Sequence, residues 1–191
     1  MNYLAHLFLA DDDDDSLLGA LMGDFVKGPV GREFSPRMRR AILQHRHIDS
    51  FTDQHPVVRQ SKQRVSPRFR RYAPILIDMF YDHFLALFWR HYTEQSLPAF
   101  SARVYRLLND RQHDLPDRML RPMHYLAHYD LLGSYQHRDG IGRALQGIES
   151  RLRRPSDLGT AIQELDANFT GLSEDFQQFF PELISMTITR E

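Results

Sequence analysis

The sequence PILIDMFYDHFLALFW at positions 74–89 decides the fold class, because it predicts a strongly apolar helix. The proline at its start suits the first turn of a helix, and we expect this helix to cover residues 74–92. Charged side chains interrupt it: Asp78 and Asp82 fall on one face, and His83 lies next to that face. Burying ionised carboxylates is costly unless each has a charged partner or a metal ion. This stretch therefore predicts both a buried helix and a candidate site. The alternative is that these groups satisfy buried backbone or arginine partners.

The rest of the chain also shows helical spacing of apolar residues, and strand signals are nearly absent. The first such segment, residues 16–27, stops at a Gly-Pro pair, as a helix should. Further helices are expected over residues 36–51, 98–109, 116–135 with a break, and 157–180. We therefore predict an all-α fold, a single-domain helical bundle spanning residues 1–191.

Composition excludes several classes of protein. The chain has no cysteine, so any metal site must consist of His, Asp and Glu side chains. The 24 basic and 25 acidic residues nearly cancel, which argues against a general nucleic-acid binder. The first ten residues lack the basic start of a signal peptide, and no apolar run approaches the ~18 residues of a membrane span. We expect a cytoplasmic protein with no membrane association. The aspartate run at residues 11–15 is expected to cap the following helix.

A second polar cluster occurs in HRHIDSFTDQHP at positions 45–56. His45, Asp49 and Asp53 recur every four residues, so a helix aligns them along one face. One imidazole and two carboxylates in that arrangement can hold a divalent cation such as Mn²⁺, or orient other ligands of it. The alternative is an exposed polar face with ion pairs along the helix.

Two further polar residues interrupt apolar stretches: Asp24 within LMGDFV and His6 within YLAHLFL. Each alone is more often a core polar residue with a hydrogen-bond partner. Together with the other clusters, however, they predict that several helices direct His or Asp side chains toward one metal site in the bundle core. Neither a G-x-S-x-G elbow nor a glycine-rich phosphate loop is present, so serine acyl transfer and P-loop chemistry are not indicated.

These stretches resemble the acyl carrier protein phosphodiesterase family. The resemblance lies in four ordered blocks, MNYLAHLFLA, SLLGALMGDFVKG, HRHIDSFTDQHP and PILIDMFYDHFLALFW, with weaker agreement to the end of the chain. Such proteins look like relatives of the HD-type phosphohydrolases, helical enzymes that bind divalent metal through His and Asp. Two departures stand out: the adjacent pair is reversed here, Asp82-His83, and Phe8 stands where relatives often carry histidine. Position 8 is therefore not expected to be an essential ligand.

The resemblance implies hydrolysis of the phosphodiester that joins a carrier-protein serine to 4'-phosphopantetheine, with Mn²⁺ as the expected ion. It implies metal ligation by Asp24, His45, Asp82 and His83. His6, Asp49 and Asp53 would be further ligands, orienting groups or proton-transfer groups. The alternatives are an HD-like hydrolase of a nucleotide or another small phosphodiester, and a non-enzymatic helical binding protein.

The implied partner is holo-acyl carrier protein, a small protein that is acidic around its modified serine. Because the chain is nearly neutral overall, docking would need a local basic patch. Arginines gather before and within the two helices that carry the candidate site: Arg37, Arg39, Arg40, Arg46, Arg68, Arg70 and Arg71. The alternative is an ordinary solvated surface.

Overall fold

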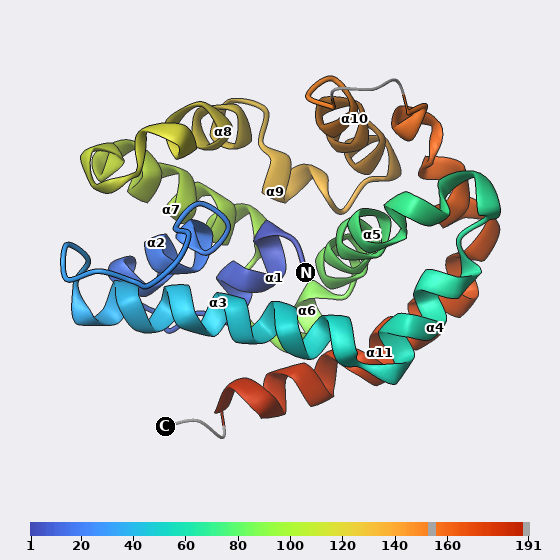
Figure 1. Cartoon of the computed structure of the whole chain (residues 1–191), viewed down its shortest axis with the longest axis horizontal. Helices are drawn as coiled ribbons and strands as arrows, with labels where there is room; N and C mark the ends of the chain where they lie inside the picture. Colours follow the sequence, from blue (N-terminus) through green and yellow to red (C-terminus); the bar gives the residue numbers. More distant parts are fainter. Residues whose placement is uncertain (153–155, 189–191) are drawn as a thin grey trace.

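Helix α5 (Ala73–Leu87) lies at the centre of the fold, as its apolar sequence predicts (Figure 1). The computed structural model describes residues 1–152 and 156–188. Leu76, Phe80 and Phe84 of α5 are completely buried in one continuous hydrophobic core. Around this helix pack α1 (Tyr3–Phe8), α4 (Pro56–Arg64), α10 (Arg138–Glu149) and α11 (Ile162–Ile188).

The described residues contain helices and no strand, which confirms the all-α prediction. The other α-helices are α2 (Asp14–Met22), α3 (Pro36–Gln54), α6 (Trp89–Tyr92), α7 (Leu97–Asp110), α8 (Asp117–His128) and α9 (Leu131–Ser134). Short 3-10 helices cover Pro67–Tyr72, Gln112–Asp114 and Leu158–Thr160. Within the described ranges, no helix is both long and apolar enough to cross a membrane.

Several expected helices differ in their ends from those observed. The helix expected over residues 74–92 divides at Phe88 into α5 and α6. The break expected within residues 116–135 is present: it falls at Asp130, which adopts a left-handed φ of 45° and caps the backbone N–H of Gly133. Helix α2 ends at Met22, so Asp24 lies in the turn that follows it. Apolar spacing is blind to these ends, because turn and cap geometry decide them.

The aspartate run caps α2, as expected. The Oδ1 atom of Asp13 accepts a hydrogen bond from the Ser16 backbone N–H at 3.0 Å. Helix α2 then packs closely along α3 (Figure 1). A glycine at position 19 permits this approach, because a Cβ atom there would lie 2.5 Å from the carbonyl oxygen of Met38. The close packing brings the end of α2 beside the polar face of α3.

Candidate metal centre and acidic pocket

Two buried histidines from different helices stack on each other and form the centre of the candidate site. The rings of His6 on α1 and His45 on α3 lie 3.6 Å apart between centroids and are nearly parallel, with an interplanar angle of 9°. Both residues are 2% exposed. The turn after α2 makes room for this pair with a glycine, because a Cβ atom at Gly23 would lie 2.1 Å from Cγ of His45.

Asp49 lies one turn beyond His45 on α3 and contacts both histidines. Its Oδ1 atom is 3.1 Å from His6 Nε2, and its Oδ2 atom is 3.2 Å from His45 Nε2. Asp24 approaches from the turn after α2, with Oδ1 at 3.5 Å from His45 Nε2. In the described part of the chain, one potential ligand atom from each of His6, His45 and Asp49 lies within 4.8 Å of the others.

The hydrogen bonding of His45 leaves its Nε2 atom directed at the two carboxylates. Its Nδ1 atom is 2.7 Å from the carbonyl oxygen of Ala20, so Nδ1 carries the proton that makes this bond. Its Nε2 atom is buried and lacks a hydrogen bond of good geometry, although Asp49 and Asp24 lie nearby. A neutral histidine held by a backbone carbonyl through one nitrogen, with the other facing carboxylates, has the arrangement of a metal ligand.

The electrostatics of the cluster favour a cation at this point. Burial alone disfavours a charged His45, but Asp24 and Asp49 outweigh it and raise the pKa of His45 to about 9. Burial lowers the pKa of His6 to about 4, so this ring is neutral. Burial would raise the pKa of Asp49, yet its contacts with His45 and His6 hold it well below the usual range. In neutral solution the cluster therefore holds either a proton on His45 or another cation in its place.

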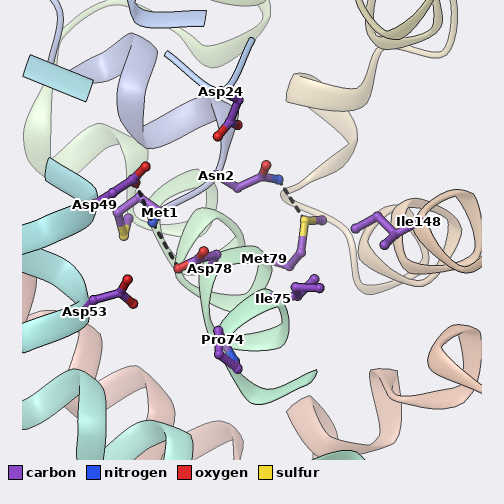
Figure 2. A pocket seen from close by; sticks show the side chains of 10 residues that line it. All are labelled: Met1, Asn2, Asp24, Asp49, Asp53, Pro74, Ile75, Asp78, Met79 and Ile148. Carbon is purple, nitrogen blue, oxygen red and sulfur yellow. Dashed lines mark hydrogen bonds and ion pairs between the residues drawn. The ribbon is translucent and has the colours of Figure 1, made fainter. Parts of the chain in front are cut away.

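The cluster opens onto a cavity of about 290 Å³, here called the acidic pocket. Four carboxylates line it, and Figure 2 shows that they come from three segments: Asp49 and Asp53 on α3, Asp78 on α5, and Asp24 after α2. The α-ammonium group of Met1 lies between two of them, 3.0 Å from Asp78 Oδ1 and 3.7 Å from Asp49 Oδ1.

Asp53 and Asp78 each have a cationic partner, as Asp49 does in the Met1 ammonium. Asp53 pairs with Lys62 at 2.8 Å and is exposed. Asp78 pairs with the Met1 ammonium, yet burial outweighs that contact and raises the pKa of Asp78. The sequence places Asp78 on the same helix face as Asp82 but does not by itself assign it a role. The available signal was the acidic face that these two residues share on one apolar helix.

Asp82 lies one turn beyond Asp78 and caps the start of α1. Its Oδ2 atom accepts a hydrogen bond from the Leu4 backbone N–H at 2.7 Å, and its Oδ1 atom accepts one from Ala5 at 3.2 Å. These donors belong to the first turn of α1, where helical N–H groups have no partner within the helix. Complete burial raises the pKa of Asp82 to about 7, against the effect of these hydrogen bonds.

His83 also has a partner of its own, because its Nδ1 atom lies 2.7 Å from the carbonyl oxygen of Tyr135. Neither Asp82 nor His83 lines the acidic pocket. We expected Asp24, His45, Asp82 and His83 to meet in one pocket, whereas the structure brings only His45 and Asp24 of these four together. The physical reason is that adjacent residues on a helix point about 100° apart, so Asp82 and His83 reach different neighbours.

Replacing Asp82 with alanine separates a capping role from a ligand role. The change leaves two buried N–H groups of α1 without an acceptor, so we expect the free energy of unfolding in urea to fall by about 3 kcal/mol. Asp82→Asn keeps one acceptor oxygen and should lose less. Unchanged stability together with lost metal binding would instead identify Asp82 as a ligand.

The arginines predicted to dock a partner differ in their contacts. Arg37 pairs with Asp13 at 3.2 Å, and Arg68 pairs with Asp157 at 3.0 Å. Arg46 donates to the carbonyl oxygens of Val26 and Gly28, so it holds the loop after α2 in place. The remaining members of the set are exposed: Arg39, Arg40, Arg70 and Arg71.

Comparisons with known proteins agree over almost the whole chain. A family model described as acyl carrier protein phosphodiesterase matches residues 1–183. The acyl carrier protein phosphodiesterase of Enterobacter sp. (strain 638) is 36% identical over 185 residues, covering 96% of each chain. The protein of the same name from Serratia proteamaculans (strain 568) is 35% identical over 185 residues with the same coverage. No solved structure matches the chain, so the expected relation to HD-type folds stays a prediction.

Proposed function

Because this chain belongs to the acyl carrier protein phosphodiesterase family, we propose that the acidic pocket is where it hydrolyses the phosphodiester of holo-acyl carrier protein. Water is the second substrate, and the products are the carrier with a free serine and 4'-phosphopantetheine. The observation that carries this assignment is the buried His6–His45 stack bridged by Asp49 at the wall of the pocket. This cluster joins imidazole and carboxylate donors, and Asp49 links it to the cavity that it lines.

A divalent metal ion fits this cluster. His45 offers a buried Nε2 atom without a well-aligned hydrogen bond, and Asp49 contacts it from one turn away. We propose that His6, His45 and Asp49 hold the ion, with Asp24 as a fourth ligand. The mixed imidazole and carboxylate set is suited to Mn²⁺, the ion that the family resemblance implies. When bound, such an ion neutralises phosphoryl charge and makes water a stronger acid.

The other groups of the pocket offset the charge of the substrate's surroundings and accept a proton. A phosphodiester is an anion, so the carboxylates would repel it unless cations offset them. The Met1 ammonium supplies one such positive charge: although burial opposes it, Asp78 and Asp49 raise its pKa. Asp78, whose pKa is raised by burial, is suited to accept the proton of the attacking water. Asp53 lines the pocket and pairs with Lys62, so it contributes to the charge there.

The docking surface is part of the same proposal. Arg39 and Arg40 lie on the helix that carries His45, and Arg70 and Arg71 precede α5. Exposed arginines at these places attract an acidic carrier and fix its register.

Reversing the charge of Arg39 and Arg40 to glutamate should therefore raise the KM for holo-carrier about tenfold at low salt. Hydrolysis of a small phosphodiester should not change, and added salt should weaken carrier turnover by the wild-type protein in the same way. The matched control reverses Arg106 and Arg118, which are exposed on α7 and α8. Equal effects from both pairs would place the docking surface elsewhere.

The reaction itself is tested by incubating holo-carrier with the protein and Mn²⁺, followed by intact mass measurement of the carrier. The expected result is loss of the whole phosphopantetheine group. Parallel incubations with nucleotides and small diesters test the alternative of an HD-like hydrolase, which would cleave those and leave the carrier intact. An unchanged carrier in every condition would contradict the assignment. A cytoplasmic location belongs to the same proposal, because enzyme and carrier must share a compartment.

A further inference from the structure

The acidic pocket lies between two other cavities. One, here called the slot, has a volume of about 110 Å³ and shares three lining residues with the pocket: Asn2, Met79 and Ile148. The other measures about 300 Å³, shares Asp24 and Asp49 with the pocket, and adds basic residues. The acidic pocket therefore adjoins a distinct space through each of two sets of its lining residues.

The slot differs in chemistry from the pocket that it adjoins. None of the described residues that line it carries a carboxylate. Its walls are mostly aromatic and aliphatic, with Arg151 as the charged side chain among them. Two of its tyrosine hydroxyls stay neutral, because burial raises the pKa of Tyr3 to about 12 and that of Tyr135 well above its usual value. The Nδ2 atom of Asn2 donates to the Tyr135 hydroxyl at 3.1 Å, at the junction of slot and pocket. Largely apolar walls with a few hydrogen-bonding groups suit an uncharged chain that contains amides.

The cavity on the other side carries basic side chains. Lys27 and Arg46 line it together with Gly28, beside the shared Asp24 and Asp49. Arg46 is held there by its hydrogen bonds to the Val26 and Gly28 carbonyl oxygens. A phosphodiester bound at the metal centre extends in two directions, toward the carrier serine and toward the pantetheine arm. The cavity with Lys27 and Arg46 matches an acidic protein, and the largely apolar slot matches the arm.

We propose that the slot between α5, α8 and α10 binds the pantetheine arm, with the carrier protein on the side of Lys27 and Arg46. This inference rests on the proposed function and adds the direction in which the substrate lies. It also assigns selectivity: the slot recognises the prosthetic group, whereas a small diester needs only the acidic pocket.

A glycine in α10 gives a direct test. A Cβ atom at Gly147 would lie 3.5 Å from the Tyr125 hydroxyl oxygen, an ordinary contact, so a larger side chain there extends into the slot. Gly142 on the same helix has nothing within 4 Å of such an atom. Because leucine favours helix formation more than glycine by roughly 1 kcal/mol, both Gly147→Leu and the control Gly142→Leu should fold.

We expect Gly147→Leu to lower kcat/KM for holo-carrier at least tenfold, and Gly142→Leu to leave it unchanged. Both variants should hydrolyse bis(4-nitrophenyl) phosphate like the wild-type protein. Calorimetry with pantetheine should show binding to the wild type and to Gly142→Leu, and at least tenfold weaker binding to Gly147→Leu. Should Gly147→Leu fail to fold, Gly147→Ala takes its place with a smaller expected loss.

Equal pantetheine binding by all the variants, or no pantetheine binding by the wild type, would overturn the slot assignment. Failure of the proposed function looks different, because the wild type would then leave holo-carrier intact. The calorimetric comparison still decides the slot in that case, since it requires no turnover.

Discussion

Replacing Asp49 with alanine should lower the turnover of holo-carrier by at least about a thousandfold, the size of loss expected when a metal centre is dismantled. Asp49 contacts both histidines of the cluster and also approaches the Met1 ammonium. Its removal takes away the carboxylate that contacts all three of these groups. Because its side chain is 40% exposed, the fold should tolerate the change with helical content near normal.

The matched control is Asp53→Ala, one turn further along α3. Asp53 lines the same pocket but pairs with Lys62 and contacts neither histidine in the cluster. A loss of about tenfold or less is expected there, because Asp53 acts only on the charge at the edge of the pocket. The experiment measures kcat and bound Mn²⁺ for both variants alongside circular dichroism. Near wild-type turnover of Asp49→Ala, or equal losses in the two variants, would refute the role given to Asp49.

Removal of metal should abolish hydrolysis of holo-carrier. After exhaustive chelation we expect a fall of at least about a thousandfold in kcat, because the pocket then lacks the charge that offsets its carboxylates. Added Mn²⁺ should restore wild-type turnover.

The variant His45→Ala provides the control for this experiment. It retains the acidic pocket but lacks the buried Nε2 atom, so Mn²⁺ should restore little of its activity at concentrations that saturate the wild type. His124→Ala, an exposed histidine on α8, should behave as the wild type does. Full turnover by the chelated wild-type protein would show that hydrolysis needs no exchangeable ion.

The candidate centre is assembled from separate helices rather than from an adjacent pair. Asp82 and His83 are neighbours in sequence, yet one caps α1 and the other binds the Tyr135 carbonyl oxygen. His6 and His45 are far apart in sequence, and their rings stack. The Asp82-His83 pair, which is reversed relative to the HD order, does not line the acidic pocket.

The sequence predicts the parts of this site that depend on helical period. The spacing of His45 and Asp49 places them on one face of α3. In the structure His45 Nε2 lies 3.2 Å from Asp49 Oδ2. Asp24 and His6 were expected near that face because each interrupts an apolar stretch, and both lie beside His45.

The remaining parts depend on which helix ends meet, and periodicity carries no such information. The sequence leaves Asp82 with either a charged partner or metal, or buried backbone partners, and the free N–H groups at the start of α1 are its partners. The Met1 ammonium enters the pocket for the same reason, because the start of α1 lies against α5. The slot likewise forms only where α5, α8 and α10 come together, so no single stretch of sequence indicates it.

The location of the metal ion tests the account most directly. A crystal soaked in Mn²⁺ and measured for anomalous scattering should show a peak bound by His45 Nε2 and an Asp49 carboxylate oxygen, at metal-ligand distances of about 2.0–2.2 Å. His6 and Asp24 should complete the site from the two flanking segments. A peak at Asp82 and His83 instead, or none at the cluster in crystals of protein that Mn²⁺ activates, would contradict it.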